Sequence, residues 1–299
     1  MKLARWLSGC LLLAGFALGT YVDRAPKTAP ITMGGYRVLA GDFHIHSFPL
    51  SWSTLSPWDT VIEAQRQGLD VIAMTGHNHV WVAKVGRWFS QRSGGPTVLV
   101  GEEIVTPTYH LLALGIEQTV SWRQSAASAI AEIHKQGGVA IAAHPSAKYW
   151  SGFDDEAMRE LDGAEVVHPI IYVRANAHRE IQQFYARKSM TAFGDSDYHG
   201  VGPMGLCRTY VFAADNSEGA VMDALRSGHT VVYERDGQAY GDPELVRLAA
   251  QNGLFEKTRP VMPGPLVKIS AGCGIAGLLA MFLFGLGRVG ADASAARPT

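Results

Sequence analysis

Residues 38–47 read VLAGDFHIHS, an apolar run followed directly by a His-x-His pair. The run from Val38 to Phe43 is typical of a buried strand, and His44 and His46 stand at its carboxyl end. Residues two apart on a strand point to the same side, so both imidazoles can reach one ion. This segment therefore predicts a strand that ends in a pair of metal ligands.

Short apolar runs of the same kind alternate with helix-like windows along the chain. Runs that are apolar throughout imply burial on both faces, as in a parallel sheet or a barrel, and the alternation indicates the α/β class. In such folds the chemistry lies at the carboxyl ends of the strands. We expect further strands at 71–75, 97–100, 111–116, 139–143, 164–167, 191–193, 209–213 and 230–233, and helices at about 58–67, 122–136 and 218–226.

Candidate metal ligands gather at these expected strand ends. Mixed imidazole and carboxylate ligands suit Zn, Mn or Fe, and more than four candidates indicate two or three ions rather than one structural zinc. We interpret the other four histidines, His134, His168, His178 and His229, as structural. The candidates beyond the first strand are His77, His79, Glu102, Glu103, His110, His144, Asp197 and His199.

Composition excludes several other classes. The formal net charge is −1 and no run of Lys or Arg occurs, so we expect no nucleic-acid partner. The three cysteines are too few and too scattered for a disulfide framework or a zinc ribbon. The sequence gives no indication of the oligomeric state.

The order of the motifs resembles the PHP (polymerase and histidinol phosphatase) family of metal-dependent phosphoesterases, over roughly residues 36–240. The motifs are His-x-His, Thr-x-His-Asn after a Gly-Leu-Asp strand, Gly-x-Glu-Ile, a His that opens a strand, Ala-His-Pro, and Ser-Asp-x-His. The segment ALRSGHTVV, residues 224–232, resembles the carbaryl-hydrolase-like branch. The resemblance implies a distorted (β/α)7 barrel with a two- or three-metal site at its strand ends.

Carried over by position, the resemblance assigns the ligands of two metal ions. Glu103 would bridge them, and Glu102 is expected to be an outward-facing neighbour. Asp42 and Asp195 are expected to orient ligands. The first ion would be held by His44, His46, Glu103 and Asp197, and the second by Glu103, His110 and His144.

The third metal site of the family departs from its usual pattern here. Its histidines would be His77 and His199, but Trp52 stands where an acidic ligand is expected, and Gly76 replaces a carboxylate. We therefore expect a binuclear centre of two divalent ions, with the third site empty or completed by His79. With that site vacant, His77 or His199 could protonate the leaving group.

The leading functional prediction is a hydrolase of small-molecule phosphate esters that uses a metal-bound hydroxide. Arg174 and Arg208 could neutralise substrate phosphate, although salt bridges are the commoner role of such residues. One alternative is a carboxyl- or carbamate-ester hydrolase with the same centre. Another is a non-catalytic metal-binding ectodomain at a membrane.

Both ends of the chain are apolar. Residues 7–22 carry no charge and follow Lys2 and Arg5, as in a signal peptide or signal anchor, and residues 269–287 are long enough to span a bilayer. We expect membrane attachment with the catalytic domain on the extracytoplasmic side. The expected parts are a signal or anchor segment at 1–29, the hydrolase domain at 30–245, a linker at 246–267, a transmembrane helix at 268–288 and a tail at 289–299.

Overall fold

The computed structural model describes residues 2–23, 30–200, 202–258 and 265–286, which fall into two units. One unit comprises residues 28–258, and the other comprises residues 1–27 together with 259–299. The expected tail at 289–299 lies outside the described residues.

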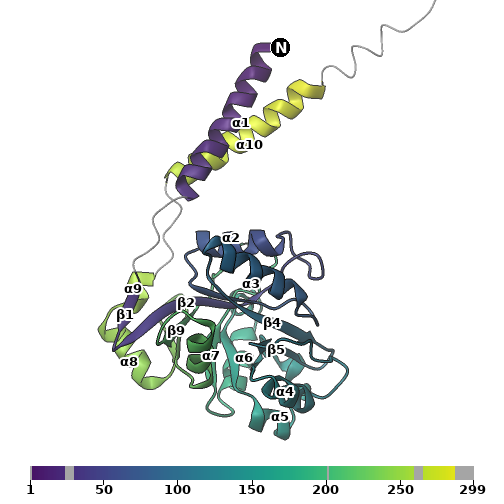
Figure 1. Ribbon diagram of the computed structural model, residues 1–299, viewed down its shortest axis with the longest axis vertical. Helices are drawn as coiled ribbons and strands as arrows, with labels where there is room; N and C mark the ends of the chain where they lie inside the picture. Colours follow the sequence, from purple (N-terminus) through teal and green to yellow (C-terminus); the bar gives the residue numbers. More distant parts are fainter. Residues whose placement is uncertain (1, 24–29, 201, 259–264, 287–299) are drawn as a thin grey trace, which may run out of the picture. The chain divides into compact units, whose positions relative to one another are not determined.

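The larger unit is built on one mixed sheet of eleven strands (Figure 1). The strand order is β11-β10-β9-β2-β3-β4-β5-β6-β7-β8, with β1 paired to β2. The strands are β1 (Ile31–Met33), β2 (Tyr36–Ile45), β3 (Val71–Met74), β4 (Thr97–Val105), β5 (His110–Leu114), β6 (Val139–Ala142), β7 (Gly163–Val167), β8 (Thr191–Gly194), β9 (Thr209–Ala213), β10 (Thr230–Tyr233) and β11 (Ala239–Gly241).

The sheet curls into a nearly closed barrel. Thr230 Oγ1 on β10 donates to the carbonyl of Ala192 on β8 at 2.8 Å. The backbone N–H of Gly194 on β8 donates to Thr209 Oγ1 on β9, also at 2.8 Å. These bonds join the β8 edge to the far part of the same sheet. The predicted α/β barrel is thus confirmed, as a mixed rather than a purely parallel sheet.

The antiparallel strand β5 breaks the parallel order expected from the apolar runs. β5 pairs antiparallel with both β4 and β6, whereas β2–β3–β4 and β6–β7–β8 are parallel. The cause is a tight turn in which Thr106 N–H donates to the carbonyl of Tyr109 at 3.1 Å. The chain has no room for a helical crossover between β4 and β5, so it returns as a hairpin.

Strand side chains are buried on both faces, as the unbroken apolar runs predicted. On β3, Val71 and Ala73 belong to one cluster with residues of α7 (Glu218–Arg226), while Ile72 and Met74 belong to a second. That second cluster includes side chains from α2 (Pro57–Arg66), α3 (Trp81–Ser93), α4 (Ala126–Lys135), α5 (Asp155–Glu160) and α6 (Ala177–Tyr185).

Serine caps explain why three of the expected helices begin where they do. Ser56, Ser125 and Ser217 each accept a backbone N–H three residues ahead, which satisfies one of the unpaired donors of α2, α4 and α7. Helix α3 was not expected. Its N-cap, Val80, makes no side-chain capping bond, so the usual start signal is absent.

Part of the expected linker at 246–267 is folded. Helices α8 (Pro243–Gln251) and α9 (Leu254–Thr258) bury Leu245, Ala249 and Leu254 in a cluster with residues of β1, β2, β9 and β10. Asp242 caps α8 by accepting the N–H groups of Glu244 and Leu245. Apolar residues at helical spacing are the reason that this segment packs. Residues 259–264 of that expected linker lie outside the described residues.

The smaller unit consists of α1 (Lys2–Asp23) and α10 (Pro265–Leu286), which run antiparallel. Ser270 Oγ donates to the carbonyl of Gly15 at 2.8 Å, and Arg5 Nη2 donates to that of Phe284 at 2.8 Å. A Cβ on Gly15 would lie 2.6 Å from the backbone nitrogen of Gly274, so only glycine permits this close approach.

Helix α1 meets the requirements for a membrane span in length and composition. Residues Leu3–Tyr21 have a mean hydropathy of 1.4, and most of their side chains are exposed. The described apolar stretch of α10, Lys268–Phe284, is shorter. Its large side chains, such as Ile275 and Phe282, are exposed as well.

Candidate metal centre

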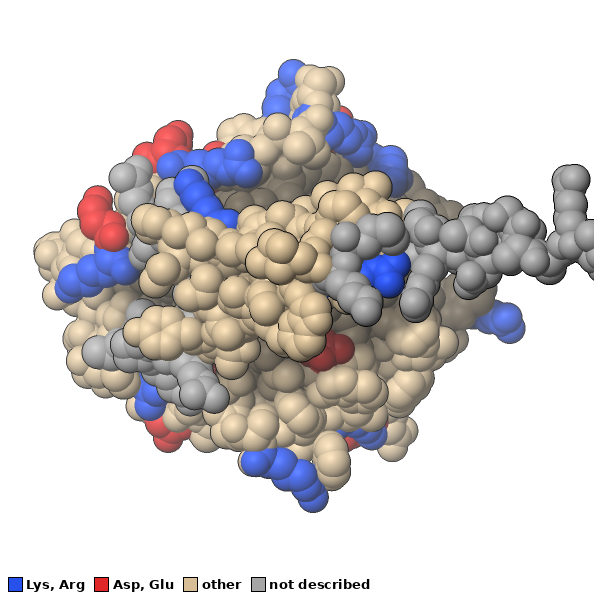
Figure 2. All heavy atoms as spheres, turned by 90° about the horizontal axis from the view of Figure 1, so that it is seen from above, with Lys and Arg blue, Asp and Glu red and all other residues tan. Residues whose placement is uncertain are grey.

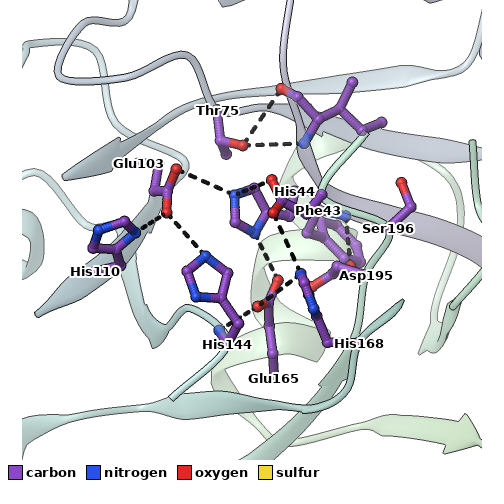
Figure 3. A network of polar contacts seen from close by, with 12 residues as sticks. Phe43, His44, Thr75, Glu103, His110, His144, Glu165, His168, Asp195 and Ser196 are labelled. Carbon is purple, nitrogen blue, oxygen red and sulfur yellow. Dashed lines mark hydrogen bonds and ion pairs between the residues drawn. The ribbon is translucent and has the colours of Figure 1, made fainter. Parts of the chain in front are cut away.

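The eight residues predicted as ligands converge at one end of the barrel. Figure 3 labels His44, Glu103, His110 and His144, whose side chains point toward one another. Parallel strands deliver them at or just past their carboxyl ends, and the antiparallel β5 delivers His110 as its first residue. Each belongs to at least one group of three residues whose ligand atoms lie within 4.8 Å of one another. These groups are His44, His46 and Asp197; Glu103, His110 and His144; His46, His77 and His199; and His44, His144 and His168.

The first group surrounds the end of β2. Nε2 of His44 and Nε2 of His46 lie 3.3 and 3.0 Å from Oδ1 of Asp197. Glu103 Oε2 lies 3.4 and 3.5 Å from the same two nitrogens. Both imidazoles are completely buried. The four residues assigned to the first ion therefore point at one small volume.

The second group uses the other oxygen of Glu103. Oε1 lies 2.7 Å from Nδ1 of His110 and 3.3 Å from Nε2 of His144. Glu103, which is 2% exposed, thus presents one oxygen to each group. This is the arrangement that a bridging carboxylate requires.

The third group consists of three imidazoles and has no carboxylate of its own. His199 Nδ1–H donates to the carbonyl of Asp197 at 2.8 Å, which leaves its Nε2 lone pair free. His77 Nε2 lies 3.2 Å from Glu103 Oε2. Trp52, at the position where an acidic ligand was expected, is 88% exposed.

The donor atoms fit metal ions better than they fit one another. His44 Nε2 and both ring nitrogens of His46 are buried without a hydrogen-bond partner. Buried polar atoms in this state are costly, and metal coordination would satisfy the Nε2 atom of each ring. His44 Nδ1 lies 2.8 Å from Glu165 Oε1, so Nε2 is the ring nitrogen that faces the centre.

Charge at the centre favours cations. Burial would raise the pKa of Glu103, but His44 and the contact with His110 hold it well below its usual range. Burial would likewise raise the pKa of Asp197, but His44 and the contact with His168 hold it well below. Burial lowers the pKa of His46 to about 4, which favours the neutral ring, whose one lone pair can ligate a metal ion.

Two of the predicted ligands have a backbone conformation that residues other than glycine rarely adopt. His144 has a φ of 28° and Asp197 a φ of 49°. Such left-handed backbone costs free energy, and it persists where the surrounding structure demands it. Neither distortion is visible in the sequence.

Strand β7 and the residue directly after it supply two buried side chains that sequence reasoning missed. Glu165 accepts His44 Nδ1–H through Oε1, and its Oε2 accepts the backbone N–H of His144 at 2.5 Å. His168, interpreted from the sequence as structural, is 4% exposed and lies 3.6 Å from Asp197 Oδ2. His168 directly follows the expected strand at 164–167, so the strand-end rule itself could have selected it.

Asp42 and Asp195 have the orienting contacts expected of them. Asp195 Oδ1 accepts the backbone N–H of Phe43 at 2.7 Å, directly before the first ligand. Asp42 accepts both the backbone N–H and the hydroxyl of Ser196, directly before Asp197. The two aspartates join the end of β2 to the loop after β8.

Two expectations about neighbouring residues differ from the structure. Glu102 is completely buried rather than outward-facing, because the loop at Val120 covers that side of β4 and donates its N–H to Glu102 Oε1 at 2.6 Å. Burial raises the pKa of Glu102 to about 7.

His79 belongs to none of the ligand groups formed by the described residues, and it stacks on Trp81 with ring centroids 5.9 Å apart.

Of the two arginines considered for phosphate binding, one contacts the segment that follows a predicted ligand. Arg208 donates to the carbonyls of Gly205 and Gln67, which is a structural role. Arg174 is 42% exposed and reaches Ser146 Oγ at 3.4 Å, two residues beyond His144.

On the face seen in Figure 2, basic and acidic side chains of the described residues are scattered without a continuous field of one sign.

Comparison with known proteins agrees with this fold. A family model described as PHP-associated matches residues 175–230. An uncharacterized protein of Methanocaldococcus jannaschii is 29% identical over 140 residues, which is 43% of this chain and 81% of that protein.

Two solved structures are similar to this chain, to different degrees. A two-domain protein of Bacteroides vulgatus containing a predicted PHP-like metal-dependent phosphoesterase matches with a TM-score of 0.61 at 24% identity. The match covers 76% of this chain and 74% of that one. A putative metal-dependent phosphoesterase of Bifidobacterium adolescentis matches at a TM-score of 0.46 and 17% identity, covering 66% of this chain and 97% of that one. The match to the Bacteroides vulgatus protein shows that the chain has a PHP-like fold, and the ligand groups lie within that fold.

Proposed function

We propose that this chain is a membrane-attached, metal-dependent phosphoesterase that hydrolyses a small phosphate ester at a binuclear centre. The observation that carries the proposal is the position of Glu103, whose two carboxylate oxygens face separate ligand groups. Two divalent ions held in this way would lower the pKa of a water molecule and neutralise a phosphoryl group. Zn, Mn and Fe all suit these ligands.

The chain's own residues would supply proton transfer and substrate binding. His77 and His199 are 28% and 32% exposed, so both can be reached by a substrate. The group that they form with His46 has no carboxylate, so it would hold a cation less well than the first two groups. We therefore assign His77 and His199 to protonation of the leaving group. Arg174 would bind a phosphoryl oxygen at the exposed side of the centre.

The membrane attachment is proposed on the length and hydropathy of α1 and on the exposed apolar side chains of α1 and α10. Large unpartnered apolar side chains over the surface of a helix pair favour a lipid environment. We propose that the catalytic domain lies on the extracytoplasmic side.

The test is metal content and hydrolysis of the full chain purified in detergent. We expect about two ions per chain and hydrolysis of aryl phosphate monoesters or diesters, with both lost in His44→Ala and Glu103→Ala. A folded protein without stoichiometric metal would refute the ligand assignment.

The same assay separates the alternatives. The resemblance of residues 224–232 to a carbaryl-hydrolase-like branch favours a carboxyl- or carbamate-ester hydrolase as the second candidate. Hydrolysis of aryl carboxyl esters but not of aryl phosphates would select it. Bound metal without turnover of any ester would select a metal-binding ectodomain.

A further inference from the structure

We propose that His168 directs an N–H group at Asp197 to orient its carboxylate and is not a metal ligand, although it lies among the ligand histidines. This inference rests on the proposed function, because the role of Asp197 as a ligand is part of it. His168 is thus a positioning residue, which acts through the carboxylate that it orients.

The tautomer of His168 follows from its contact with the backbone. The N–H of Ile170 lies 3.1 Å from His168 Nδ1 in hydrogen-bond geometry. A backbone N–H can only donate, so Nδ1 is the acceptor and carries a lone pair. The ring proton is then on Nε2. A nitrogen that carries a proton cannot coordinate a metal, which removes His168 from the group of possible ligands that it forms with His44 and His144.

The protonated nitrogen is directed at the centre. His168 is 4% exposed, and its Nε2 has no hydrogen-bond partner at its present distances. The acceptors in reach are Asp197 Oδ2 at 3.6 Å and Glu165 Oε2 at 4.0 Å. Glu165 Oε2 also accepts the backbone N–H of His144, and it lies farther from His168 Nε2 than Asp197 Oδ2 does.

The two oxygens of Asp197 would then have different roles. Oδ1 lies 3.3 and 3.0 Å from the ring nitrogens of His44 and His46, so it faces the first metal position. Oδ2 faces His168. A donor on Oδ2 fixes the orientation of the carboxylate and leaves Oδ1 for the ion, as outer-sphere partners of metal ligands commonly do.

A purely structural role must be separated from this one. His168 is also the N-cap of the short 3₁₀ helix Pro169–Tyr172, through the contact with Ile170. His168→Asn keeps a capping acceptor, because Asn is a strong N-cap residue, but its shorter side chain lacks a donor at the position of Nε2. His168→Gln is the converse variant, with an amide donor that reaches farther and no well-placed cap.

The experiment measures the affinity of the full chain in detergent for Zn²⁺ and Mn²⁺ by competition with a chelating dye, beside wild type and His144→Ala. We expect His168→Asn to bind the full number of ions at saturation, but with affinity reduced about 10- to 100-fold, and His168→Gln to recover part of it. His144→Ala should lose an ion at any metal concentration.

Two results would overturn the inference. Loss of an ion at saturation in His168→Asn would make His168 a ligand. Wild-type affinity in His168→Asn would reduce His168 to a helix cap. If wild type itself binds no stoichiometric metal, the proposed function fails, and that failure is recognised before any variant is compared.

Discussion

Glu165 accepts the Nδ1–H of His44 at 2.8 Å, and both side chains are completely buried. The charges of His44 and Glu165 shift the pKa of each other. Burial lowers the pKa of His44, but the charges of Asp197 and Glu165 raise it well above its usual range. Burial raises the pKa of Glu165, but His44 and His168 bring it below its usual range. The contact fixes the ring of His44 so that Nε2 faces the centre.

Glu165→Gln should therefore weaken metal binding without touching a ligand. The amide keeps the size of the side chain but loses the charge that orients His44 and the firm acceptor for the N–H of His144. We expect metal affinity to fall about 10- to 100-fold in dye competition. The matched control is Glu160→Gln at an exposed acidic residue. Equal titrations for the two variants would contradict the role given to Glu165.

Removal of metal should lower thermal stability. Without ions, the carboxylates of Glu103 and Asp197 and the unpartnered nitrogens of His44 and His46 remain buried together. An ion at one hundred times its Kd stabilises by about 2.7 kcal/mol, which is about 5–10 °C in Tm for a domain of this size. We expect EDTA to lower Tm by at least this amount and added Zn²⁺ or Mn²⁺ to restore it. An unchanged Tm after verified metal removal would argue against a buried centre.

His77→Ala should separate proton transfer from metal binding. We expect the variant to keep about two ions and to lose about 10²- to 10⁴-fold in kcat, because a general acid is missing. His79→Ala is the matched control, since His79 lies two residues away and outside the ligand groups of the described residues. A reduced metal content in His77→Ala would instead make the third group a metal site.

The glycine contacts of the smaller unit predict that α1 is retained beside α10. A Cβ on Gly19 would lie 3.0 Å from Ser270 Oγ, so G19C with S270C should form a disulfide when Cys10 and Cys273 are replaced by Ser. G9C with S270C is the control, because a Cβ on Gly9 meets nothing within 4 Å. Non-reducing gels and the intact mass provide the measurement. A mass that lacks the N-terminal segment would mean that it is cleaved as a signal peptide.

One rule predicted most of the residues that the structure brings together at the candidate centre. Apolar runs marked the strands, and polar residues at their ends marked the rim, as for His44 and His144. Glu165 escaped this rule because it lies inside an expected strand, where the sequence does not say which face points at the centre. Glu102 was placed on the correct side of β4, opposite Glu103, but the loop that buries it could not be foreseen.

The hairpin of β4 and β5 has a consequence for how the centre is maintained. Val105 is paired with His110, and Glu103 with Leu112, so the shared carboxylate and the first residue of β5 are diagonal neighbours on one face. A single tight turn thus determines the spacing between Glu103 and His110, which the proposed binuclear centre would use for one of its ions. A one-residue slip of this register would turn one of the two side chains to the opposite face. The number of ions in the proposed centre would therefore depend on the length of this loop as much as on the identity of the ligands.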